Sequence, residues 1–129
     1  MKLLLAAMLA ASAATVHAAP LTIPVGETWV FTVRNGEPAN AHKVAFSAKP
    51  TKGQLMISVR WLFGTNMIVR NNSPIAYTFR AELLSNGKTT ATRPCDLPAN
   101  GKPILEQWPQ RADAVRISQF RTAAKQGRC

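Results

Sequence analysis

Histidine and acidic side chains are scarce in this chain of 129 residues, which holds two His and six Asp or Glu residues. Nucleophilic catalysis of the Ser-His-Asp or Cys-His kind needs an imidazole. After the first 18 residues the only imidazole is His42, at the start of a strand-like segment, and there is no GxSxG motif. The acids are scattered without metal-ligand spacing, and the glycines stand singly rather than in a phosphate-binding loop. We therefore expect no enzyme activity, no catalytic residues, no metal and no cofactor.

Long apolar runs are missing except at the N-terminus. Residues 3–14 are apolar or small, they follow Lys2, and small side chains occupy the two positions that a signal peptidase reads, Val16 and Ala18. The run is too short to cross a bilayer. This pattern predicts a cleavable secretory signal over residues 1–18 and a mature domain over 19–129 in the periplasm or the medium. No later run approaches about 18 apolar residues, so we expect no transmembrane segment in the mature chain.

Cysteine occurs twice, as Cys95 and Cys129, without CxxC spacing. In an exported domain, two cysteines favour one disulfide bond. Closing a loop of about 35 residues would stabilise the fold by roughly 3–4 kcal/mol. The alternative is two free thiols that serve redox or metal chemistry, which is disfavoured because such sites use closer spacing.

Negative charge is in short supply, so the chain has a net charge of +10, or +9 once the segment containing Lys2 is removed. This excess favours contact with anionic material such as an envelope polymer, a lipid headgroup, nucleic acid or an acidic protein, although it could serve solubility alone. We expect no nucleic-acid partner, because binding of that kind uses exposed aromatic residues among the basic ones. Only Trp108 and Phe120 are candidates for exposure.

Apolar and polar residues alternate along most of the remaining sequence, which is the pattern of β-strands. Asn35-Gly36 follows the first long predicted strand, and Ser85-Asn86-Gly87 is the best candidate for a hairpin turn. Four prolines within residues 94–109 predict a long crossover loop, with room for a short strand at 104–105. The predicted strands cover residues 28–34, 42–48, 54–63, 66–70, 75–84, 88–92 and 114–121. The aromatic residues expected in the core are Trp29, Phe31, Phe46, Trp61, Phe63, Tyr77 and Phe79.

Six or seven short strands in a domain of about 110 residues predict an all-β fold, a small antiparallel β-sandwich. An immunoglobulin-like topology is the first choice and a small barrel is the second. Neither topology specifies a function, because folds of this kind carry many.

Three strand arginines are the strongest candidates for a binding site. Arg60, Arg80 and Arg116 alternate with apolar core positions, and each has a hydroxyl side chain two residues away. If their strands are neighbours, these arginines form a cationic stripe, and the planar guanidinium suits phosphate and carboxylate groups. The alternative is that arginine is simply tolerated on solvent-facing strands, where it discourages edge pairing.

The expected function is that of an exported, non-catalytic binding module for an anionic envelope polymer or lipid headgroup. The first alternative is a protein-interaction module, an inhibitor or accessory subunit that contacts an envelope protein. It would use the loop that begins at Pro94 and ends at Arg111, with Trp108 as an exposed anchor. The second alternative is an enzyme of unrecognised type.

Overall fold

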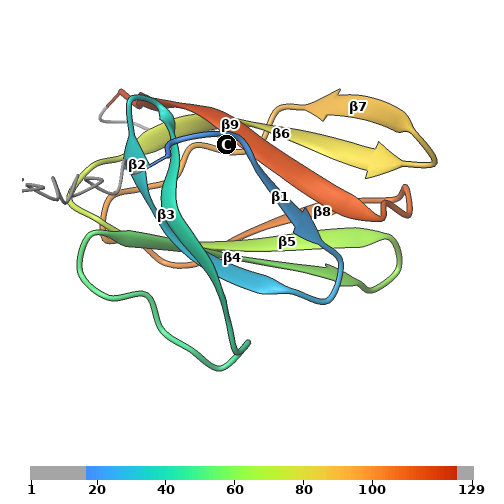
Figure 1. Ribbon diagram of the computed structural model, residues 1–129, viewed down its shortest axis with the longest axis horizontal. Coiled ribbons are helices and arrows are strands. Elements are labelled where there is room, and N and C mark those ends of the chain that lie inside the picture. Colours follow the sequence, from blue (N-terminus) through green and yellow to red (C-terminus); the bar gives the residue numbers. More distant parts are fainter. Residues whose placement is uncertain (1–16, 125–129) are drawn as a thin grey trace, which may run out of the picture.

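The computed structural model describes residues 17–124, which form two antiparallel sheets packed face to face (Figure 1). One sheet has four strands in the order β1-β9-β6-β7, and the other has five in the order β3-β2-β4-β5-β8. The small antiparallel β-sandwich predicted from the sequence is confirmed. The strands are β1 (Leu21–Pro24), β2 (Thr28–Arg34), β3 (Glu37–Val44), β4 (Gln54–Trp61), β5 (Thr65–Asn72), β6 (Tyr77–Ser85), β7 (Lys88–Thr92), β8 (Ile104–Trp108) and β9 (Ala114–Thr122).

Phe120 on β9 lies at the centre of the core, with 2% of its surface exposed. Its ring stacks on that of Phe79, with centroids 5.3 Å apart, and meets the edge of Tyr77 at 5.8 Å. Phe31, from the opposite sheet, approaches the same ring at 5.6 Å. Aromatic pairs of this geometry add to the stabilisation that comes from burial of their apolar surface. Phe120 therefore joins the two sheets, and our expectation that it could be exposed was wrong.

Most strand positions agree with the alternation in the sequence, and β2 and β7 agree residue for residue. The strand predicted over 42–48 begins earlier and ends at Val44, because the chain turns back at Asn35-Gly36 and pairs Glu37–Val44 with β2. β1 was not predicted; it is four residues long and ends in Pro24. β8 extends to Trp108 inside the segment predicted as a crossover loop, where it pairs with β5. Short edge strands carry too few residues to show a clear period.

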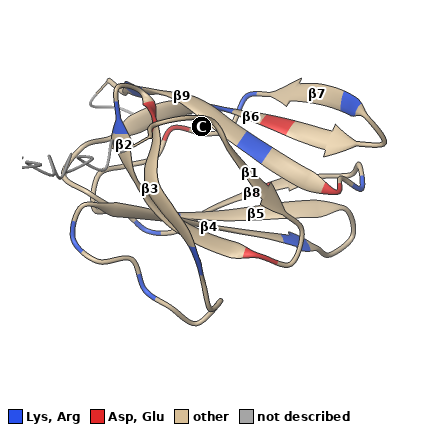
Figure 2. Cartoon of the chain, viewed as in Figure 1, with Lys and Arg blue, Asp and Glu red and all other residues tan. Residues whose placement is uncertain are grey.

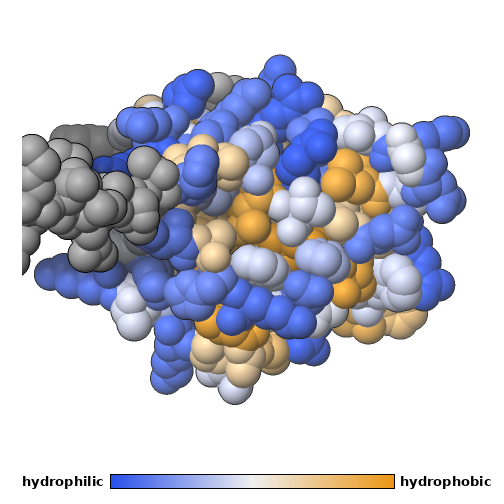
Figure 3. All heavy atoms as spheres, in the orientation of Figure 1, coloured by the Kyte–Doolittle hydropathy of each residue, from blue (hydrophilic) through white to orange (hydrophobic). Residues whose placement is uncertain are grey.

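Three aromatic residues predicted in the core lie at the surface instead. Phe63 is 98% exposed, and Phe46 and Trp61 are each about half exposed. Phe46 follows the end of β3, and Phe63 lies in the turn between β4 and β5. In both cases the apolar pattern continues past the last paired residue, where the chain leaves the sheet. Figure 3 shows the outcome on one face: apolar side chains lie between the two layers, and hydrophilic ones surround them.

The beginning of the described chain is attached to the sandwich. The Ala19 amide donates to the Pro38 carbonyl at 3.1 Å, and Ala18 forms a bridge with Ala39. Residues 1–16 of the predicted secretory signal lie outside the described residues, and so does Cys129. The signal and the Cys95–Cys129 disulfide therefore stay predictions. Within residues 17–124, no helix is long and apolar enough to cross a membrane.

Candidate functional site

Two of the three candidate arginines, Arg80 and Arg116, lie on neighbouring strands of the four-stranded sheet and share one acid. Glu82 pairs in register with Arg116 and lies two residues from Arg80, so all three side chains project from the outer face. Arg116 Nε–H donates to Glu82 Oε1 at 3.1 Å, and Arg80 Nη2 lies 3.5 Å from Glu82 Oε2. The Glu82 side chain is only 11% exposed. The hydrogen bond from Arg116 is the main reason that the pKa of Glu82 lies below its usual range.

This arrangement changes what the two arginines offer to a ligand. One carboxylate accepts contacts from both guanidinium groups, so it offsets half of their combined charge. An incoming phosphate would have to compete with Glu82 for the same donors. The structure therefore brings Arg80 and Arg116 together, as predicted for neighbouring strands, but both already contact the carboxylate of Glu82.

Arg60, the third candidate, lies on β4 in the other sheet and does not join Arg80 and Arg116. On the same strand, Ile57 and Val59 are fully buried and face the core. Because side chains alternate along a strand, Arg60 lies on the outer face. The guanidinium carbon lies 3.5 Å from the ring centroid of Phe46, a cation–π contact that holds the arginine against the sheet. The predicted stripe of three arginines is thus divided between two opposite faces of the sandwich.

Further cations gather beside Arg60. Arg70 on β5 is exposed between Val69 and Asn71, both of which are buried, so Arg70 also projects from the outer face. Lys49 comes from the β3–β4 loop, which folds over the same part of the sheet. In the lower part of Figure 2, blue Lys and Arg segments lie along this loop. We call Lys49, Arg60 and Arg70, together with Phe46, the basic face.

A groove of about 190 Å³ runs between the β3–β4 loop and the outer surface of β4 and β5. Lys49 and Arg70 line it as cations, Met56 and Ile68 provide apolar surface, and Ser47 adds a hydroxyl. The groove therefore combines two cations with a small amount of apolar surface, which suits an anionic group attached to a carbon skeleton.

The stretch of sequence that carries the basic face lacks acidic residues. Between Glu37 and Glu82 the chain has no Asp or Glu but has six Lys or Arg residues: Lys43, Lys49, Lys52, Arg60, Arg70 and Arg80. Glu106 lies nearby on β8 but pairs in register with Met67, a core residue, so it faces inward. There its Oε1 accepts the Cys95 amide hydrogen at 2.6 Å. The acid-free stretch is visible in the sequence and could have led to this site.

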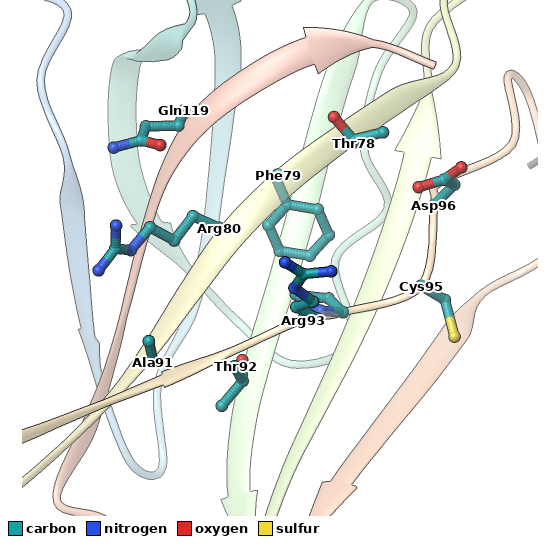
Figure 4. A pocket seen from close by; sticks show the side chains of 10 residues that line it. Thr78, Phe79, Arg80, Ala91, Thr92, Arg93, Cys95, Asp96 and Gln119 are labelled. Atoms are coloured by element: carbon teal, nitrogen blue, oxygen red, sulfur yellow. The ribbon is translucent and has the colours of Figure 1, made fainter. Parts of the chain in front are cut away.

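A larger cleft of about 790 Å³ opens at the edge of the four-stranded sheet (Figure 4). The pairing of β6 with β7 ends at Ala81 and Thr92, and β6 meets the chain again at the Tyr77–Leu97 bridge. The intervening residues bow outward and leave the opening. Arg80 on β6 and Arg93, which directly follows β7, both line it, and so does Asp96. Because charges of both signs line this cleft and Arg80 is paired to Glu82, it is less selective for anions than the basic face.

The segment around Trp108 is bound to the sandwich over most of its length. Leu97 is buried and exchanges two backbone hydrogen bonds with Tyr77, at 2.8 and 3.0 Å. Trp108 is half-buried on β8 and packs against the core. The protein-interaction alternative would be supported by an exposed Trp108 on a protruding loop, and Trp108 is instead half-buried on β8.

Chemistry-bearing side chains show no convergence in the part of the chain that the structure describes. His42 is exposed, and its Nδ1 lies 3.1 Å from the Asn40 carbonyl oxygen. Within residues 17–124, no three His, Cys, Asp or Glu side chains come together in a way that could hold a metal ion. The described residues define an all-β sandwich whose basic face lies in a stretch of sequence without Asp or Glu. No family model, curated protein or solved structure matches this chain.

Proposed function

We propose that this protein is an exported, non-catalytic binding module that attaches to anionic envelope material through the basic face. The ligand class is a phosphate- or carboxylate-bearing polymer or lipid headgroup. One observation carries the proposal: an acid-free stretch of the sequence folds so that Lys49, Arg60 and Arg70 share one outer surface. Arginine donates two parallel hydrogen bonds to such anions, and a rigid sheet holds the donors in place.

The basic face is a better candidate than the pair Arg80 and Arg116. Those two arginines have Glu82 between them, whereas no Asp or Glu lies within 20 residues of Arg60 or 10 residues of Arg70 in the sequence. Arg60 is also oriented by its contact with Phe46, which reduces the conformational freedom that it would lose on binding. The alternative of a protein-binding loop at Trp108 receives less support, because Leu97 and β8 bind that segment to the sandwich.

The test compares two double variants that remove the same charge from different faces. R60Q/R70Q changes the basic face, whereas R34Q/R93Q removes two exposed arginines elsewhere. Each protein, purified after export, is bound to immobilised inorganic polyphosphate and eluted with salt. We expect R60Q/R70Q to bind roughly ten- to thirtyfold more weakly than the wild type, since each basic residue near an anionic surface contributes about 1 kcal/mol.

We expect R34Q/R93Q to remain within about threefold of the wild-type affinity, because its cations lie away from the basic face. Equal losses in both double variants would mean that net charge alone drives adsorption, which overturns the assigned site. A loss confined to R34Q/R93Q would move the site to the cleft beside Arg93. Circular dichroism and thermal unfolding should show that all three proteins are folded.

A further inference from the structure

The turn between β4 and β5 presents three consecutive apolar side chains to solvent. Trp61 is 45% exposed, Leu62 is 63% exposed and Phe63 is 98% exposed. Single exposed apolar residues are ordinary on protein surfaces, but a contiguous group at a tip marks an interaction site. In Figure 1 this turn lies at the right-hand end of the molecule, away from the β2–β3 and β5–β6 turns.

The backbone of this tip is held in an uncommon conformation. Phe63 has a φ of 53°, in the left-handed region that bulky residues rarely adopt, and Gly64 follows with a φ of 114°. A side chain at Gly64 would collide with the Trp108 carbonyl oxygen, so this position requires glycine. Outliers of this kind persist only where the surrounding structure enforces them, and they occur mainly at functional positions.

Hydrogen bonds from both sides hold the tip in place. The Asn66 side-chain amide donates to the Leu62 carbonyl at 2.7 Å. The Trp61 indole N–H donates to the Ala112 carbonyl at 2.6 Å. Thr65 is fully buried; its hydroxyl donates to the Gln110 carbonyl at 2.7 Å and accepts the Ala112 amide hydrogen at 2.8 Å. The exposed apolar residues therefore stand on a fixed support, so little conformational entropy would be lost when they are buried.

Two guanidinium groups accompany the apolar tip. The Arg111 guanidinium carbon lies 3.8 Å from the ring centroid of Trp61, and Arg60 immediately precedes Trp61 on β4. Both arginines are exposed. The tip thus combines an apolar point with cations at its base, a combination that matches the layered chemistry of an anionic membrane surface, where phosphate groups lie above the hydrocarbon.

We propose that the β4–β5 tip inserts into the interfacial layer of an anionic lipid membrane, with Phe63 and Leu62 in the acyl boundary and Arg60 and Arg111 at the phosphates. This inference rests on the proposed function and names its partner as a lipid surface. Phe63 is almost fully exposed at the end of the tip. Its apolar surface would be buried if the tip entered a soft layer such as a lipid interface. The Trp61 ring, half-exposed and bonded through its N–H, lies between the apolar and charged parts, as tryptophan does at membrane interfaces.

The first experiment measures partition of the protein, purified after export, onto vesicles of phosphatidylcholine with about one third phosphatidylglycerol. F63N removes the apolar contact, and asparagine tolerates the left-handed backbone of this position. I75N is the control, because Ile75 is another exposed apolar residue, 43% exposed, but lies in the β5–β6 connection at the other end of β5. We expect F63N to partition roughly tenfold more weakly than the wild type, and I75N to be unchanged.

The second experiment measures how deeply the side chain at position 63 enters the bilayer. F63W is mixed with vesicles whose phospholipids carry brominated acyl chains, and its fluorescence is compared with that of the wild type, which has three tryptophans. We expect additional quenching in F63W, because the new indole would reach the acyl boundary. Equal quenching in both proteins, together with full vesicle binding by F63N, would overturn insertion.

The same samples separate this inference from the proposed function. A wild-type protein that binds polyphosphate but ignores anionic vesicles overturns the membrane partner and leaves the anion-binding function intact. A protein that binds neither probe overturns both. Vesicle binding that F63N weakens and that R60Q/R70Q also weakens supports both together.

Discussion

Arg116 and Glu82 face each other across neighbouring strands, and Arg116 Nε–H donates to Glu82 Oε1 at 3.1 Å. They are 34 residues apart in the sequence, so the pairing of β6 with β9 brings them together. Arg80 approaches the other carboxylate oxygen. This relationship decides the electrostatics of the four-stranded sheet, because it converts two cations and an acid into a self-contained network. Arg60 and Arg70 lie on the other sheet, in the stretch of sequence that contains no Asp or Glu.

The first prediction concerns the charge of Glu82. Because its pKa is lowered in the folded protein from a usual value of 4.5, chiefly by the hydrogen bond from Arg116, the charged form stabilises the fold. That contribution is present above the unfolded pKa and disappears as the pH falls through the lower, folded pKa. We expect E82Q to reduce the free energy of unfolding by roughly 1–2 kcal/mol near neutral pH. Urea denaturation of the wild type and E82Q, from neutral to acidic pH, measures the difference in their free energies of unfolding.

The control is the double variant E82Q/R116Q, which removes both partners of the hydrogen bond. It should lose less stability than the sum of the two single variants. A difference between wild type and E82Q that stays constant well below pH 4.5 would contradict the assigned role of the carboxylate.

The second prediction compares two phenylalanines whose environments differ sharply. Phe120 touches three aromatic rings in the core, whereas Phe46 is 49% exposed and contacts Arg60. We expect F120A to lower the free energy of unfolding by about 3–5 kcal/mol, since it leaves a cavity between the sheets. F46A should cost about 1 kcal/mol or less, the value of an exposed cation–π contact. Thermal and chemical denaturation of both variants test this; similar costs would contradict the packing.

The third prediction concerns the cysteines. Cys95 and Cys129 are expected to form a disulfide in an exported domain. If they do, the free energy of unfolding of C95S/C129S should be roughly 3–4 kcal/mol lower than that of the oxidised wild type. A reductant should lower the stability of the wild type by a similar amount and leave the variant unchanged. Thiol titration under denaturing conditions should find no free thiol in the oxidised protein. Two reactive thiols would instead indicate that the cysteines remain reduced.

The strands were predictable where the local pattern is long and lies within a paired region. β2 and β9 were found because alternating residues pack against a core on one face. β7 was found because a polar, β-branched segment follows the Asn86-Gly87 turn. The strand predicted over 42–48 lies too late in the sequence. β3 begins directly after the Asn35-Gly36 turn, but residues 37–41 alternate too weakly to indicate a strand. The candidate site was only partly predictable, since Arg60, Arg80 and Arg116 look alike in sequence, although Glu82 neutralises two of them and Phe46 orients the third.

By itself, the sequence determined the all-β class, the predominance of basic residues and the acid-free stretch between Glu37 and Glu82, because these depend on composition and local alternation. Only the tertiary structure decided which strands share a sheet, and hence which charges meet. It also decided that Phe120 fills the core while Phe63 stands in solvent. The physical reason is that alternation gives each strand two faces, but pairing between segments far apart in the sequence decides which face is covered and where the strand ends.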